Sequence, residues 1–128
     1  MVLMMSNYGM PPEIKRGEIW RVNLNPSKGS ELQKIRPAVV ISSNEIAGHQ
    51  VKLVVPITEW DVRYREKYWY VPIINSITNG LEKLSAADTT MTRSLATSVE
   101  RFKEKLGTLE PETLDLITQT LSAVIETK

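Results

Sequence analysis

The chain has 128 residues, of which 41% are hydrophobic and 24% charged, and its formal net charge at pH 7 is +1. This length supports one folded domain with its own hydrophobic core, and the composition is that of an ordinary globular protein. The absence of cysteine excludes disulfides, thiolate catalysis and cysteine-ligated zinc, and no apolar run is long enough to cross a bilayer. We therefore expect a cytoplasmic protein with one domain over residues 16–128, preceded by a flexible leader over residues 1–15.

The charge is unevenly distributed along the chain. Residues 15–36 contain six basic and two acidic side chains, whereas residues 110–128 contain one basic and four acidic side chains. A basic front and an acidic tail favour binding to a nucleic acid, although the small net charge requires that such binding depend on local clustering.

The first half of the chain predicts three strands. Residues 17–24 alternate between apolar and polar side chains, which is typical of a half-buried strand. Residues 25–35 are polar and contain Pro26 and Gly29, so they predict a mobile surface loop. Residues 37–42 and 51–57 are rich in β-branched side chains and predict a hairpin, in which Pro56 indicates a strand end or an edge.

The second half predicts further strands and two helices. Residues 68–74, 85–95 and 106–109 are the expected strands, and residues 96–105 and 111–126 the expected helices. The second helix begins with Pro111 and has one apolar stripe. Short strands followed by a terminal helix predict an α+β protein that is mainly β, with a small, partly open β-barrel packed on helices.

Three polar residues at the ends of these strands suit the cleavage of RNA. RNA can be cut when its own 2′-hydroxyl attacks the adjacent phosphorus, and the phosphorane that forms is negatively charged. The guanidinium of Arg36 matches phosphate oxygens, and Pro37 restricts Arg36 to extended backbone angles. Thr58 offers a hydroxyl for the phosphate or the nucleophile, and Glu31 is the nearest carboxylate for proton transfer.

Each of these residues also has an ordinary structural interpretation. An arginine before a proline is usually a solvated surface residue, a threonine that closes a strand is usually a turn residue, and a loop glutamate is usually a surface charge. The order and spacing of the three residues therefore carry the prediction.

Five aromatic residues crowd between positions 60 and 70, with basic residues between them. Aromatic faces stack on unpaired bases, and cations hold the backbone. The alternative is that Tyr68 and Tyr70, or Trp69, simply pack in the core. We expect alternation to bury part of this set, which leaves four better candidates for RNA contacts: Trp60, Arg63, Tyr64 and Arg65. His49 is the only histidine, so catalysis by two histidines of one subunit is excluded.

The ordered motifs of the chain resemble those of the MazF/PemK family of toxin endoribonucleases. The matching segments are Gly17-Glu18-Ile19-Trp20, Asn25-Pro26, Gly29-Ser30-Glu31, Arg36-Pro37 with the apolar run after it, and Pro56-Ile57-Thr58. The resemblance covers residues 16 to about 109, and residues 111–126 are similar to the C-terminal helix of the family. It implies the SH3-like, partly open barrel of the CcdB/PemK type.

The resemblance also implies roles for single residues. The family's catalytic arginine and threonine map onto Arg36 and Thr58, and its functional loop glutamate maps onto Glu31. Ser85 and Arg93 fit late positions of the family pattern and are candidates for RNA contacts, whereas Met91 stands where the family usually has glutamine. Lys28 and Lys34, in or beside the same loop as Glu31, are further candidates for RNA contacts.

The implied activity is cleavage of single-stranded RNA at short sequences, without metal or other cofactor, leaving a 2′,3′-cyclic phosphate and a 5′-hydroxyl. The implied partners are a second copy of the chain and a cognate MazE-like antitoxin with an acidic, initially disordered segment. Two alternatives stay open: a non-enzymatic toxin of the gyrase-poison type on the same fold, and an RNA-binding barrel without catalysis.

Overall fold

Seven strands and one α-helix make up most of the computed structural model, which describes residues 13–25, 34–46 and 50–126. The strands are β1 (Glu18–Asn23), β2 (Ile35–Val40), β3 (Val51–Glu59), β4 (Tyr70–Ile73), β5 (Ser85–Asp88), β6 (Arg93–Ala96) and β7 (Phe102–Thr108). The α-helix is α2 (Pro111–Val124), and three single-turn 3-10 helices are η1 (Asn44–Ile46), η2 (Val62–Glu66) and η3 (Thr89–Met91).

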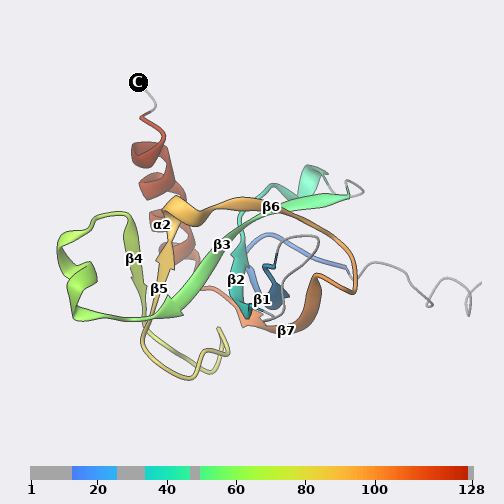
Figure 1. Ribbon diagram of the computed structural model, residues 1–128, viewed down its shortest axis with the longest axis horizontal. Helices are drawn as coiled ribbons and strands as arrows, with labels where there is room; N and C mark the ends of the chain where they lie inside the picture. Colours follow the sequence, from blue (N-terminus) through green and yellow to red (C-terminus); the bar gives the residue numbers. More distant parts are fainter. Residues whose placement is uncertain (1–12, 26–33, 47–49, 127–128) are drawn as a thin grey trace, which may run out of the picture.

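The strands form one antiparallel sheet in the order β4-β5-β3-β2-β1-β7, and β6 pairs separately with β3 (Figure 1). Within the described part of the chain, the outer strands β4 and β7 do not pair with each other, so the curved sheet is not closed. The prediction of a mainly β, partly open barrel with a C-terminal helix is therefore confirmed.

The central strand β3 exchanges partners along its length. Its first half, Val51 to Val54, pairs with β6, and its last residues, Ile57 to Glu59, pair with β5. Pro56 lies between these two stretches, in the interior of a strand rather than at its end or at an edge of the sheet. A proline is accepted there because its missing N–H falls where one neighbour has ended and the next begins.

Two hydrophobic clusters occupy the two faces of the central strands. Alternate residues point to opposite faces, so Ile19, Val39 and Val55 belong to the first cluster and Trp20, Val40 and Val54 to the second. The first cluster lies under α2, which contributes Leu114 and Ile117. The second is closed by Ile14, Leu95 and Phe102.

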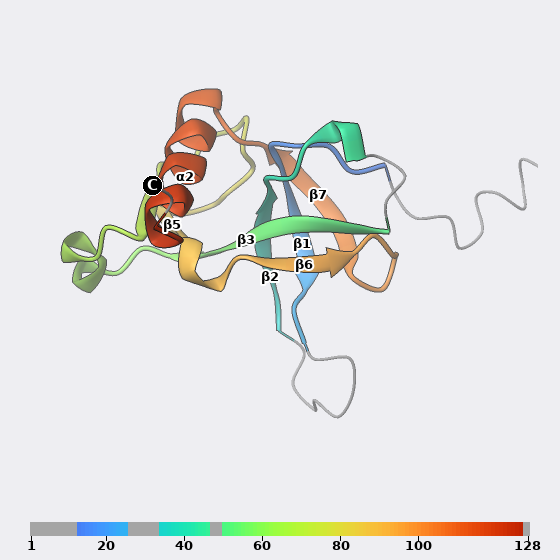
Figure 2. The same cartoon turned by 90° about the horizontal axis from the view of Figure 1, so that it is seen from above.

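Helix α2 packs beside β4 and η3, on the side of the sheet far from β6 and β7 (Figure 2). Its apolar stripe buries Leu114 and Ile117, and Leu121 packs on the same cluster. Pro111 stands at its start, where the missing N–H costs no helical hydrogen bond. The predicted helix over residues 111–126 is thus confirmed.

The predicted helix over residues 96–105 is wrong. Residues 98–101 form a turn, in which the Phe102 backbone N–H donates to the Ser98 carbonyl at 2.8 Å, and Phe102 then begins β7. Phe102 is opposite Val22 in the β1–β7 pairing and packs edge-on against Trp20, with ring centroids 5.8 Å apart. Pairing with β1 thus overrides the local helical pattern.

The predicted strand over residues 85–95 is two strands, because η3 separates β5 from β6. The Asp88 side chain caps η3 by accepting a hydrogen bond from the Thr90 backbone N–H. This turn lets the chain pair with both halves of β3.

The Gly17-Glu18-Ile19-Trp20 motif stabilises the fold. The Glu18 carboxylate accepts hydrogen bonds from the Trp20 indole at 2.9 Å and the Lys15 backbone N–H at 3.0 Å, and it pairs with Lys105 at 3.1 Å. Burial raises the pKa of Glu18, but these interactions outweigh it and hold that pKa below its ordinary value.

No helix in the described segments is long and apolar enough to span a membrane.

Candidate active site

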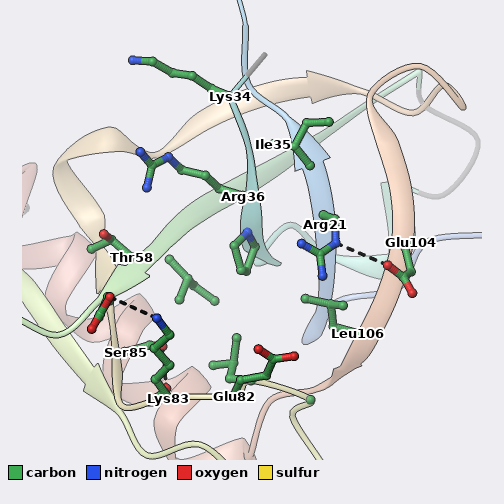
Figure 3. A pocket seen from close by; sticks show the side chains of 15 residues that line it. Arg21, Lys34, Ile35, Arg36, Thr58, Glu82, Lys83, Ser85, Glu104 and Leu106 are labelled. Carbon is green, nitrogen blue, oxygen red and sulfur yellow. Dashed lines mark hydrogen bonds and ion pairs between the residues drawn. The ribbon is translucent and has the colours of Figure 1, made fainter. Parts of the chain in front are cut away.

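A cleft of about 800 Å³ opens between the β1–β2–β3 sheet, β7 and the loop that precedes β5 (Figure 3). Charged and polar side chains surround an apolar floor that includes Ile57, Leu81 and Leu106. The cleft brings together four residues singled out by the sequence: Lys34, Arg36, Thr58 and Ser85.

Strand register explains why Arg36 and Thr58 stand together. Ala38 is opposite Pro56 in the β2–β3 pairing, so the same register continued by two residues brings Arg36 opposite Thr58. Both residues then belong to the same face of the sheet, because side chains two positions apart share a face. Figure 3 shows the two side chains side by side at the rim of the cleft.

Arg36 presents its guanidinium to solvent. The residue is exposed, and no carboxylate or carbonyl among the described residues accepts a hydrogen bond from its side chain. Arg36 lies in β2, so its extended backbone agrees with the restriction that Pro37 imposes. A positioned, unpaired guanidinium is suited to bind a phosphate through two parallel hydrogen bonds.

Four other charged residues of the cleft form two ion pairs. Arg21 Nε lies 3.3 Å from Glu104 Oε1, and Lys83 Nζ lies 3.4 Å from Glu59 Oε1. Within the described segments, these pairs leave two cations of the cleft, Lys34 and Arg36, without an anionic partner. The local positive field therefore concentrates at the end of the cleft where β2 begins.

The far wall of the cleft is a loop, residues 74–84, held by one buried asparagine. Asn79 Oδ1 accepts hydrogen bonds from the backbone N–H groups of Ser76 and Leu81, both at 3.0 Å. Asn79 Nδ2 donates to the Ile74 carbonyl at 3.0 Å and to Glu110 Oε1 at 3.1 Å. A fully satisfied buried amide fixes this wall in one conformation.

Backbone contact with β7 fixes the same wall from the other side. Gly80 has a φ of +74°, and a Cβ there would collide with the Leu106 carbonyl. A Cβ at Gly107 would likewise collide with the Thr78 carbonyl. The two glycines allow the loop and β7 to approach each other closely.

Ser85 and Arg93 are both engaged within the protein. The Ser85 hydroxyl is buried at the cleft and donates to the Lys83 carbonyl at 2.8 Å. Arg93 lies outside the cleft, and its guanidinium donates to the Leu24 carbonyl at 2.9 Å. Arg101 donates in the same way to the carbonyls of Asn23 and Asn25. The two arginines hold the end of β1 and the residues directly after it.

The aromatic residues between positions 60 and 70 form a surface cluster rather than part of the core. The rings of Tyr64 and Tyr70 stack with centroids 3.7 Å apart, and Trp60 meets Tyr64 edge-on at 5.8 Å. None of the three is fully buried, and Tyr68 is 60% exposed. The Trp60 backbone N–H donates to the Leu84 carbonyl at 3.0 Å, which places the cluster directly beyond the Thr58 end of β3.

The two arginines of this segment differ in their partners. Arg63 binds Asp61 through two hydrogen bonds of 2.9 and 2.8 Å, and these lower the pKa of Asp61 to about 2. Arg65 is exposed, and no described residue accepts a hydrogen bond from it. Arg65 is therefore the freer cation beside the aromatic cluster.

Two predicted site residues, Lys28 and Glu31, lie outside the described residues, as does His49. Asn25 is buried beside that segment, and its Oδ1 accepts a hydrogen bond from the Lys34 backbone N–H at 2.8 Å. This bond joins the two ends of the segment that carries Lys28 and Glu31. Met91, at the end of η3, is 59% exposed.

Sequence reasoning missed five charged residues of the cleft: Arg21, Glu59, Glu82, Lys83 and Glu104. Arg21 and Glu104 are opposite each other in the β1–β7 pairing, which the incorrect helix over residues 96–105 concealed. The dipeptide Asn79-Gly80 is typical of a turn, but it does not reveal that the loop forms a wall of the cleft.

A family model described as "PemK-like, MazF-like toxin of type II toxin-antitoxin system" matches residues 15–125. The chain is 35% identical over 100 residues to Endoribonuclease MazF9 of Mycobacterium tuberculosis, a match that covers 73% of this chain and 80% of that protein.

Solved structures show the same fold. An endoribonuclease from a Mycobacterial species, solved in complex with its cognate antitoxin, superposes with a TM-score of 0.69 at 20% identity, covering 91% of this chain and 98% of that one. MazF of Deinococcus radiodurans superposes with a TM-score of 0.65 at 18% identity, covering 91% of this chain and all of that one. With the family match over nearly the whole chain, these findings establish that the protein belongs to the PemK-like, MazF-like toxins of type II toxin–antitoxin systems.

Proposed function

We propose that the protein is an endoribonuclease that cleaves single-stranded RNA at short sequences. The observation that carries this proposal is the juxtaposition of Arg36 and Thr58 at the rim of one cleft, where neither side chain has a hydrogen-bond partner among the described residues. The 35% identity to Endoribonuclease MazF9 supports the same activity. The proposed catalytic domain comprises residues 16–128, and its site of action is the cytoplasm.

The proposed reaction needs no nucleophile from the protein. The 2′-oxygen of the RNA bonds to the adjacent phosphorus and loses its proton, while the bond from phosphorus to the 5′-oxygen breaks and that oxygen takes up a proton. The products are a 2′,3′-cyclic phosphate and a 5′-hydroxyl. Because the nucleophile belongs to the substrate, the reaction does not depend on a metal-bound hydroxide.

In this mechanism Arg36 binds two non-bridging oxygens and stabilises the charge of the phosphorane. Thr58 donates its hydroxyl to the same phosphate and fixes its position. Glu31 supports its loop or transfers a proton. Lys34 and Lys28 contact the flanking phosphates, and Ser85 and Arg93 hold the local structure. Trp60 and Tyr64 stack on the bases of adjacent nucleotides, and Arg63 and Arg65 hold the backbone of these nucleotides.

The proposed partners are a second copy of the chain and a cognate antitoxin of the MazE type. An acidic antitoxin segment would be attracted to the end of the cleft that holds Lys34 and Arg36, and would there exclude RNA. One structural neighbour is itself described as an endoribonuclease in complex with its cognate antitoxin.

The test is to incubate the protein with a long mixed-sequence RNA in EDTA and to sequence the new 5′-hydroxyl ends. We expect cuts at one short motif, and Arg36→Ala should slow them by about 10³-fold or more while the protein remains folded by circular dichroism. Lys103→Ala, an exposed residue of β7 outside the cleft, is the control and should cut like the wild type. Intact RNA with the wild type, or unchanged cleavage by Arg36→Ala, would contradict the proposal.

A further inference from the structure

The wall of the cleft carries one carboxylate whose charge no described residue compensates. Glu59 and Glu104 have cationic partners, Lys83 and Arg21, but no described residue donates a hydrogen bond or forms an ion pair with Glu82. Glu82 is exposed, and its side chain points into the cleft in Figure 3.

An unpaired carboxylate opposes the binding of a phosphate. Within a site that holds a polyanion, such a group is compatible with binding only if it faces a part of the ligand that donates hydrogen bonds. In single-stranded RNA these donors are the 2′-hydroxyls of the riboses and the edges of the bases, and only the base edges differ from one nucleotide to another.

In the cleft, the side chains suited to a phosphate and the carboxylate suited to a base edge lie on opposite sides. Arg36 and Thr58 stand at one rim, and Glu82 projects from the opposite wall (Figure 3). The cleft also presents two half-buried apolar side chains, Pro37 and Leu106. A nucleotide whose phosphate is bound at the rim can therefore lay the flat face of its base on these side chains and turn the edge toward Glu82.

The chemistry of the edge selects one base. Guanine presents two neighbouring donors, N1–H and the N2 amino group, which match the two oxygens of one carboxylate. Cytosine and adenine present one amino group beside an acceptor nitrogen, and uracil presents one N–H between two carbonyls. We propose that Glu82 reads guanine in the RNA that the cleft binds, an inference that rests on the proposed function.

The wall is rigid enough for this role. Asn79 accepts a hydrogen bond from the Leu81 backbone N–H directly before Glu82, and the Ser85 hydroxyl donates to the Lys83 carbonyl directly after it. A carboxylate held on such a loop discriminates between bases because the loop does not rearrange to accept a poorer match.

The experiment measures cleavage and binding with guanine or inosine at the same position, because inosine keeps N1–H but lacks the N2 amino group. Wild type, Glu82→Gln and Glu104→Gln are compared. The last variant removes the same charge from the same cleft, so it controls for general electrostatics. Binding is measured by fluorescence anisotropy with oligonucleotides that lack the 2′-hydroxyl and cannot be cut.

For the wild type we expect a preference for guanine over inosine of about tenfold in cleavage and in binding, the size of one lost hydrogen bond to a base. Glu104→Gln should keep this preference, and Glu82→Gln should lose it and cut at a relaxed motif. The role of Glu82 would be overturned if Glu82→Gln and Glu104→Gln changed the preference for guanine over inosine equally, or if the wild type did not distinguish guanine from inosine. A wild type that prefers guanine in binding but cuts no RNA would instead overturn the proposed endoribonuclease activity.

Discussion

Arg36 and Thr58 illustrate how two ordinary surface residues become a site. Neither is buried, and in the described part of the chain neither side chain has a hydrogen-bond partner. The two side chains can bind one phosphate together because neither is engaged with a described residue, and the register of β2 and β3 places them close to each other. Arg93, by contrast, is engaged with the Leu24 carbonyl, so its contribution acts through the loop that it holds.

At this scale the hydroxyl of Thr58 can be tested without disturbing the strand. Thr58→Val preserves shape and β-propensity but removes the donor, so cleavage should slow by about 10- to 100-fold, as for loss of a hydrogen bond to a charged group. Thr58→Ser keeps the hydroxyl and should cleave within about threefold of the wild type. The measurement is single-turnover cleavage of one defined RNA. Equal rates for the valine and serine variants would show that the hydroxyl plays no part.

At the scale of elements, the loop over residues 74–84 contributes both to the stability of the fold and to the wall of the cleft. Glu110, directly before α2, accepts hydrogen bonds from the Ser76 hydroxyl at 2.7 Å and from Asn79. The hydrogen bond from Ser76, with smaller effects of the Glu110 backbone N–H and of Asn79, holds the pKa of Glu110 below its ordinary value of 4.5 despite partial burial. The carboxylate thus joins the start of α2 to the wall of the cleft.

The lowered pKa of Glu110 predicts a pH dependence of stability. The folded state binds this proton less readily than the unfolded state, so the stabilising effect is present above about pH 4.5 and is lost as the pH falls through the folded pKa. In urea unfolding, Glu110→Gln should be less stable than the wild type at neutral pH, and the difference should shrink toward about pH 3. Glu112→Gln, in the exposed first turn of α2, is the control. A difference that is constant with pH would contradict this assignment.

The elements also show what the sequence could and could not predict. Strands β1, β2 and β3 were predictable because each carries its own alternation or β-branched run. Only the end of β7 was predicted, by the expected strand over residues 106–109, because the part before it becomes a strand only by pairing with β1. In the site, the motifs around Arg36 and Thr58 were visible locally, whereas Glu82 reaches the cleft through the long-range bond between Asn79 and Glu110.

At the scale of the whole molecule, attraction of RNA is a local effect. The net charge is +1, so the field of the whole protein is weak, and the unpaired cations at the end of the cleft dominate. Affinity should therefore depend on few phosphate contacts and respond to salt through those few residues.

The dependence of affinity on salt measures these contacts directly. For single strands, each neutralised phosphate contributes about 0.7 to the slope of log K against log salt concentration. Lys34→Gln should therefore reduce the magnitude of that slope by about 0.7 for an oligonucleotide without 2′-hydroxyls. Lys103→Gln, outside the cleft, should leave the slope unchanged. Equal slopes for all three proteins would show that Lys34 does not contact phosphate.

The close approach of Gly80 and Gly107 to the backbone opposite limits how the cleft can be re-engineered. Any side chain at either position would push β7 and the loop apart, so the shape of this wall cannot be altered at the glycines without loss of the fold. Glu82 and Lys83 follow on the same loop and project from the wall. A library randomised at these two positions would vary the chemistry of the wall while its outline stays constant, and is the natural starting point for a toxin with a new target sequence.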